Sequence, residues 1–168
     1  FLVVGMLYER RHTRMIADFG GLTKQMPVFA TFFMIVTLSS IGLPGLNGFV
    51  GEFLILVGTF KSRILYASIA TSGIILAAVY MLWMFQRVMF HEITHEENKT
   101  LQDINKREFA ILIPIILLIF WIGIYPNSFL RKMDASVNHL LKQVGEKANI
   151  VSTLQKQNEF EQLQQNVT

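Results

Sequence analysis

The sequence predicts an all-α, polytopic membrane protein: a helical-bundle fragment with one discontinuous transmembrane helix and a C-terminal amphipathic helix. Two observations predict this class. Hydrophobic residues make up 52% of the chain and charged residues 16%, well below the roughly 25% charged residues of a typical soluble domain. The three long stretches 25–60, 64–86 and 109–130 contain one charged residue between them, Glu52. The first stretch is interrupted by glycine and proline, which predicts the discontinuity.

The chain divides by composition into eight predicted segments. They are the end of a truncated transmembrane helix at 1–8, a polar loop at 9–26, a broken transmembrane helix at 27–60, a transmembrane helix at 64–87, a polar loop at 88–108, a transmembrane helix at 109–126, an amphipathic helix at 128–145 and a loosely ordered polar tail at 146–168. The first segment is apolar but too short to span a bilayer, which needs about 20 residues. We therefore expect the chain to be a fragment that starts inside a helix.

Basic residues predict which side of the membrane the loops face. They are numerous in and around the two polar loops and reduced to Lys61 and Arg63 in the short connection between them. Because loops rich in lysine and arginine stay in the cytoplasm, we expect both polar loops there or in the equivalent matrix. The basic residues form no stripe that would indicate binding to nucleic acid.

The broken segment is too long for one straight span. One helix over 25–60 would measure about 54 Å, although about 20 residues cross a bilayer. We expect a helix from about Pro27 to Ile41, a break, and a second helix from about Phe49 to Phe60. The residues that predict the break are helix breakers clustered in its middle: Gly42, Pro44, Gly45, Gly48 and Gly51.

Glu52 is the candidate functional residue, because it is ionisable and adjoins the break. Broken backbone at membrane depth is tolerated where protein or a wet cavity covers it, and an acid there predicts a function. Withdrawal from water favours the neutral carboxyl and a nearby lysine favours the charged one, so a carboxyl under both influences can relay protons. The alternative is that Glu52 reaches water at a membrane face or forms a structural pair.

The remaining spans follow from their own patterns. In 64–87, small residues recur at spacings that permit close helix packing: Ala67, Ala70, Gly73 and Ala77. Pro114 can kink the helix at 109–126. After it, apolar residues recur at helical spacing and predict a helix lying on the membrane surface or along a partner: Phe129, Met133, Val137, Leu140, Leu141 and Val144.

His91-Glu92-Ile93-Thr94-His95 fits the zinc-protease pattern H-E-x-x-H. On a helix both histidines would share a face and bind zinc, with Glu92 as general base. A third protein ligand is needed, and Asn98 and Leu101 stand where the extended motif has glycine and histidine. The chain has no cysteine, which excludes thiolate metal sites. We therefore expect no metal site and keep a membrane metalloprotease only as a minor alternative.

Several segments resemble the antiporter-like subunit M of proton-pumping NADH–quinone oxidoreductase, respiratory complex I, known in mitochondria as subunit 4. They are FLVVGMLYERRHTR at 1–14, Gly20-Gly21-Leu22 with Met26-Pro27, THEEN at 94–98, Lys106-Arg107-Glu108 and above all LSSIGLPGLNGFVGEFL at 38–54. The resemblance covers roughly 1–135 and is most specific around the break. It leaves the tail unassigned and makes the histidine motif an incidental loop sequence.

The resemblance implies a function and a role for Glu52. The chain would be the C-terminal part of a longer subunit, and Glu52 would end a line of protonatable groups whose other members are absent from this chain. Sister subunits typically have lysine at this position. The subunit would carry no cofactor, with NAD and quinone used by other subunits, and its partners would be other membrane subunits, the lipid bilayer and protons. The implied location is the bacterial inner membrane or the mitochondrial inner membrane. A related cation/proton antiporter or membrane-bound hydrogenase is the alternative with the same architecture.

Overall fold

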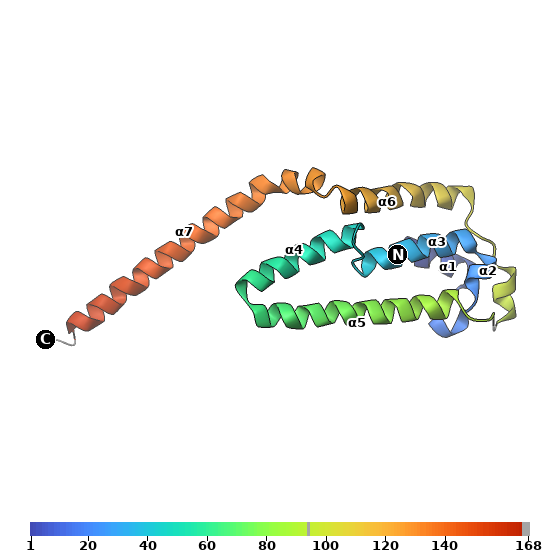
Figure 1. Cartoon of the computed structure of the whole chain (residues 1–168), viewed down its shortest axis with the longest axis horizontal. Coiled ribbons are helices and arrows are strands. Elements are labelled where there is room, and N and C mark those ends of the chain that lie inside the picture. Colours follow the sequence, from blue (N-terminus) through green and yellow to red (C-terminus); the bar gives the residue numbers. More distant parts are fainter. Residues whose placement is uncertain (94, 166–168) are drawn as a thin grey trace. The chain divides into compact units, whose positions relative to one another are not determined.

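The computed structural model describes residues 1–93 and 95–165, with side chains as far as Lys147. Helices and connections make up the described chain, and the predicted all-α class is confirmed there (Figure 1). In chain order the elements are α1 (Leu2–Arg11), η1 (Ile16–Asp18), α2 (Leu22–Gln25), α3 (Pro27–Ser40), α4 (Asn47–Ser62), α5 (Ile64–Met89), η2 (Glu96–Thr100), α6 (Lys106–Ile124) and α7 (Asn127–Gln165). They form two compact units, Phe1–Pro126 and a second that begins at Asn127.

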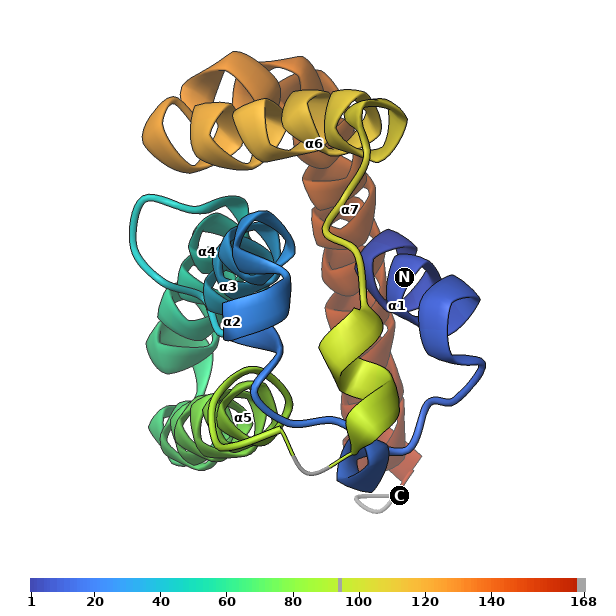
Figure 2. The same ribbon diagram turned by 90° about the vertical axis from the view of Figure 1, so that its right-hand side faces the viewer.

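The break divides the 27–60 segment into two helices that are each too short to cross a bilayer. α3 has 14 residues and α4 has 16, or about 21 and 24 Å against a hydrocarbon core of about 30 Å. α5 and α6 are long and apolar enough to cross a membrane individually. Within the first unit α4 turns back into α5, and α6 passes beside α3 and α4 (Figures 1 and 2).

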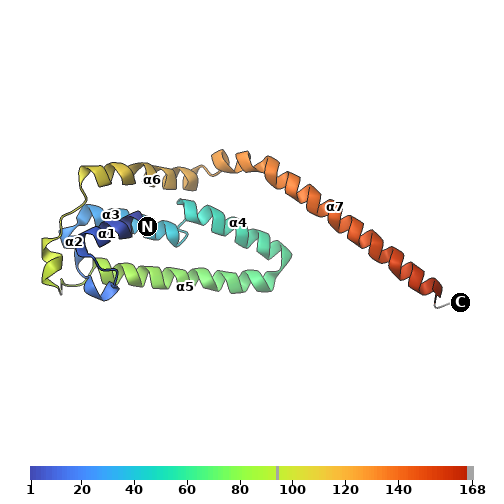
Figure 3. The same cartoon turned by 180° about the vertical axis from the view of Figure 1, so that it is seen from behind.

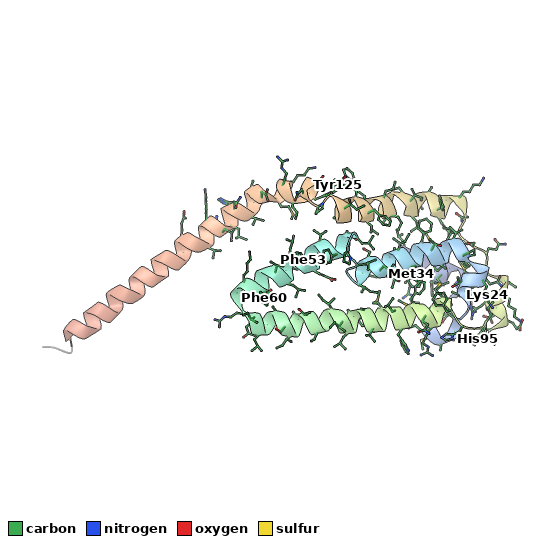
Figure 4. All side chains as sticks on the ribbon, in the orientation of Figure 1. Lys24, Met34, Phe53, Phe60, His95 and Tyr125 are labelled. Carbon is green, nitrogen blue, oxygen red and sulfur yellow. The ribbon has the colours of Figure 1, made fainter. Side chains whose placement is uncertain are left out.

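The hydrophobic core lies around α3, at the end of the first unit that holds the polar loops. Aromatic pairs join α3 to its neighbours: Phe33 contacts Phe85 of α5 with ring centroids 5.5 Å apart, and Phe32 contacts Phe109 of α6, also at 5.5 Å. α1 lies beside α3 (Figure 3) and adds Val3, Met6 and Leu7 to the same cluster. By contrast, no side chain of α4 is buried. Several of its apolar residues are exposed, among them Phe53 and Phe60 (Figure 4), as side chains are that contact lipid or further protein.

A polar network joins the two loops at this end. Arg10 donates to both carboxylate oxygens of Glu108, at 2.8 and 2.6 Å, and to the carbonyl of Gln102 at 3.0 Å. Arg11 donates to Asn98 Oδ1 at 2.8 Å, and the fully buried Asn98 donates to the carbonyl of Asp18 at 2.9 Å. The loops at 9–26 and 88–108 therefore meet at the same end of the first unit, as a shared side of the membrane requires.

Asp103 supplies the N-terminal cap of α3 from a distant loop. Its carboxylate accepts the backbone N–H groups of Val28 at 2.8 Å and Phe29 at 3.0 Å. Pro27 begins the helix and has no N–H to satisfy, which suits proline to that position. The carboxylate thus pairs two N–H groups of the first turn that have no partner within the helix. Its negative charge is also favoured by the positive N-terminal end of the helix dipole.

Replacing Asp103 by alanine is expected to loosen α3 at its start. Loss of a capping acceptor costs about 1 to 2 kcal/mol, and the melting temperature of the assembled membrane complex should fall by several degrees. Asp103→Asn keeps one acceptor oxygen and should lie between alanine and wild type. Asp134→Ala, an exposed acid on α7, is the control and should leave the melting temperature unchanged. Equal melting temperatures for all three variants would contradict the capping role.

The element bounds differ from the predicted ones for local reasons. α1 extends past residue 8 to Arg11 and ends where His12 adopts a left-handed φ of 53°. α6 begins at Lys106 because Asn105 and Glu108 form a capping box, each side chain bonding the other's backbone N–H. The polar tail predicted at 146–168 differs most, since α7 is helical as far as Gln165 and 166–168 lie outside the described residues. This stretch lacks glycine and proline between 146 and 165 and is rich in strong helix formers.

Candidate functional site

The break begins with a glycine-dependent stop of α3. The N–H of Gly42 donates to the carbonyl of Ser39 at 3.2 Å, and that of Leu43 donates to Leu38 at 3.1 Å. This pair of bonds is the Schellman motif, whose residue after the cap takes a left-handed conformation. Gly42 fills that position with a φ of +81°. The last carbonyls of α3 are therefore paired within the break itself.

A tight turn follows immediately. Leu46 N–H donates to the carbonyl of Leu43 at 3.1 Å, which closes a four-residue turn with Pro44 and Gly45 in its centre. Proline at the second position and a glycine with positive φ at the third are typical of a type II turn, and Gly45 has a φ of +93°. The chain leaves this turn through the buried Leu46 and enters α4 at Asn47.

Side-chain and backbone contacts hold the two half-helices together across the break. The Ser39 hydroxyl donates to Asn47 Oδ1. Gly48 lies directly on the Ser39 carbonyl, so closely that a Cβ at Gly48 would overlap the carbonyl oxygen. Gly123 of α6 lies in the same way on the carbonyl of Gly45. The break is thus clamped between α3, α4 and α6 by positions that admit no side chain.

Glu52 lies over the break. A Cβ on Gly42 would overlap its Oε2 and come within 3.0 Å of its carboxyl carbon, so the carboxyl group rests against the bare Cα of Gly42. The side chain is half-buried. Among the described residues, no hydrogen bond or ion pair engages its carboxylate. Glu52 is therefore an ionisable side chain at the break with no charged or hydrogen-bonding partner in the described chain.

The structure brings together most of the residues that the sequence singles out. Gly42, Gly45 and Gly48 each occupy a position where a side chain would strain the backbone or clash, and Pro44 forms the turn. Gly51 differs, because it lies inside α4 with open space around its Cβ position. Sequence analysis missed Gly123. The sequence feature that could have indicated it is that Gly123 is the single glycine of the hydrophobic helix α6.

The zinc-binding alternative has no geometric support. α5 ends at Met89, and His91 has a left-handed φ of 74°, so His91 and His95 do not share a helical face. No group of three or more potential ligands comes together within the described part of the chain. Residue 94, inside the motif, lies outside the described residues.

Comparison with known proteins gives a consistent result. The model of the family described as NADH:quinone oxidoreductase/Mrp antiporter, TM, matches residues 1–64. NADH-quinone oxidoreductase subunit M of Rickettsia prowazekii is 52% identical over 141 residues, covering 84% of this chain and 29% of the relative. NADH-ubiquinone oxidoreductase chain 4 of Marchantia polymorpha is 44% identical over 142 residues, with 84% and 29% covered.

A solved structure is also similar. A chain of respiratory complex I from Thermus thermophilus with bound NADH superposes with a TM-score of 0.70 and 34% identity, over 77% of this chain and 27% of that chain. The chain spans under a third of the length of the curated relatives it matches. The break and the residue that lies over it fall inside the span matched by the family model.

Proposed function

Because the chain belongs to the NADH:quinone oxidoreductase/Mrp antiporter family of membrane proteins, we propose that it is the C-terminal part of a proton-translocating subunit of NADH:quinone oxidoreductase. Protons would cross the membrane through this subunit while other subunits pass electrons from NADH to quinone. The support is similarity to relatives that carry this name, together with the apolar helices α5 and α6.

The observation that carries the proposal is the placement of Glu52. An acid lies against the Gly42 Cα, beside a break in a segment that has no other charged residue between Lys24 and Lys61. No cation or hydrogen-bond donor of the described chain engages it, so a water or a proton donor that reaches the carboxyl would meet no competing partner. An intramembrane acid at an interrupted helix is the arrangement that proton and ion pathways use.

Glu52 would act as the relay group. Its carboxylate takes a proton from a donor on the side of the polar loops and becomes neutral. Apolar surroundings favour this neutral form of a carboxyl group. It then releases the proton toward the opposite face and recovers its negative charge. The break contributes polar backbone at membrane depth, and water reaches the acid along it. The donor would lie outside residues 1–168.

The same proposal covers partners and location. The chain would hold no cofactor, and NADH and quinone would bind other subunits. It would lie in the bacterial inner membrane, or in the mitochondrial inner membrane if encoded there. In α7 the apolar residues Met133, Val137, Leu140, Leu141 and Val144 are all exposed. Neighbouring membrane subunits and lipid would cover them, since an uncovered apolar stripe of this length marks an interaction surface.

Purification tests the assembly part of the proposal. A full-length subunit carrying this sequence, tagged and extracted in mild detergent, is expected to bring down NADH-oxidising activity. In proteoliposomes, added NADH and quinone should then drive proton uptake. Co-purification with hydrogenase subunits would instead favour a membrane-bound hydrogenase, and cation/proton exchange without NADH oxidation would favour an antiporter. The family description names an antiporter beside NADH:quinone oxidoreductase.

A further inference from the structure

Two residues of α4 face Gly42 across the break. Gly48 and Glu52 are four residues apart in the helix, so they lie on the same face, one turn from each other. The Gly42 Cα is 3.6 Å from the position that a Cβ on Gly48 would take, and the Glu52 carboxyl rests on the same glycine. The lack of a side chain at Gly48 lets α4 approach the break, and this approach places Glu52 over Gly42.

The Glu52 carboxyl has room there because Gly42 has no side chain. A Cβ built on Gly42 would overlap Oε2 and would lie 3.0 Å from the carboxyl carbon. Carbon atoms in ordinary contact are about 3.5 to 4.0 Å apart, so the carboxyl carbon would have to move by roughly 0.5 to 1 Å. The three atoms nearest to such a Cβ all belong to the Glu52 carboxyl. A side chain at residue 42 would therefore act first on the acid.

The acid, and not the backbone beneath it, is the part that would move. The N–H of Gly42 donates to the carbonyl of Ser39 at 3.2 Å. The next N–H, of Leu43, donates to the carbonyl of Leu38 at 3.1 Å. These bonds fix the backbone around Gly42. The Glu52 carboxyl, in contrast, ends a flexible side chain and has no charged or hydrogen-bonding partner in the described chain, so it can turn aside with little loss of stability.

We propose that Gly42 is a positioning residue for Glu52: its bare Cα keeps open the place at the break where the carboxyl lies. This inference rests on the proposed relay role of Glu52. A side chain at residue 42 would displace the carboxyl from the break and leave the fold of the break intact. Proton transfer depends on such placement, since a misplacement of about 1 Å can lower a rate by up to roughly 100-fold.

Gly45 provides a matched control, because it shares the backbone conformation of Gly42 but not its neighbour. The two glycines have φ values of +81° and +93°, so alanine is strained at both. Apart from its chain neighbours, no described atom lies within 4 Å of a Cβ built on Gly45. Gly42→Ala and Gly45→Ala should therefore lower the melting temperature of the intact complex by similar amounts. NADH-driven proton pumping by the reconstituted complex should be roughly 10-fold slower in Gly42→Ala than in Gly45→Ala.

Shortening the acid gives a readout that a purely structural role of Gly42 would not change. Glu52→Asp draws the carboxyl back by roughly 1.5 Å, the length of one carbon–carbon bond, and so makes room for the new methyl group. In the wild-type and Gly45→Ala backgrounds, Glu52→Asp should lower pumping because the carboxyl no longer reaches its place. In the Gly42→Ala background it should instead raise pumping severalfold.

Equal pumping by Gly42→Ala and Gly45→Ala would overturn the inference. So would a loss of pumping by the same factor when Glu52→Asp is added to each of the three backgrounds. Should Gly42→Ala fail to assemble, Gly42→Asn and Gly45→Asn replace the alanine pair, because asparagine adopts a positive φ more readily. Gly42→Asn must then pump more slowly than Gly45→Asn and must gain activity when Glu52→Asp is added.

Glu52→Gln is measured alongside to keep the two proposals apart. If it stops pumping while Gly42→Ala pumps as fast as Gly45→Ala, the relay role of Glu52 stands and only the Gly42 inference fails. If Glu52→Gln pumps normally, the proposed function of the site fails, and the Gly42 inference fails with it.

Discussion

Glu52→Gln in the intact complex is expected to lower NADH-driven proton pumping by about 10-fold or more, since a group that takes up and releases protons contributes at least that much to a transfer rate. Glutamine has nearly the same shape but cannot accept and release a proton at neutral pH. Assembly should be unaffected, because no hydrogen bond or ion pair within the described chain depends on the Glu52 carboxylate. Pumping in proteoliposomes and the amount of assembled complex are the two measurements.

Glu52→Asp is the matched comparison. Aspartate keeps the carboxyl group and shortens its reach by one methylene, so its carboxyl is drawn back from Gly42. We expect part of the activity to remain, above Glu52→Gln and below wild type. Wild-type pumping by Glu52→Gln would rule out the relay. Loss of assembled complex in that variant would show that the carboxylate has a structural partner.

Gly48→Ala is expected to give the largest loss of stability of any single methyl addition in this segment. Its new Cβ would overlap the Ser39 carbonyl oxygen, and this neighbour is backbone that cannot swing aside. Overpacking of this kind costs about 1 to 3 kcal/mol. α3 and α4 would have to separate, and the Ser39–Asn47 hydrogen bond would be lost with them. The assembled complex should melt several degrees lower and accumulate to a lower level in the membrane.

Gly51→Ala provides the control for that prediction. The two glycines lie three residues apart in α4, but the Cβ position of Gly51 is open. Alanine is the better helix former by about 0.5 to 1 kcal/mol, so Gly51→Ala should melt at or slightly above the wild-type temperature. Equal melting temperatures for Gly48→Ala and Gly51→Ala would show that the close contact at Ser39 is not needed.

The position of the break could be predicted because its causes are local. Gly42 and Pro44 end a helix through their own backbone preferences, whatever surrounds them. Glu52 stood out for a similar reason, as the one charge in a long apolar run. The role of Gly51 could not be predicted in this way, because its spacing matches the other glycines and only its surroundings differ.

Contacts between distant segments could not be predicted. Asp103 caps α3 from a loop about 75 positions away in the sequence, and Gly123 lies on the carbonyl of Gly45 from another helix. In neither case does the neighbouring sequence indicate which distant segment the residue contacts.

By itself the sequence determined the helical class, the apolar segments, the interruption after Ser40 and the isolated acid beyond it, because composition and backbone preference act within a few residues. The tertiary structure alone decided that the acid folds back onto Gly42 and that α6 covers the break. Those outcomes depend on which helices approach closely enough to touch, and close approach is set by packing across the whole unit.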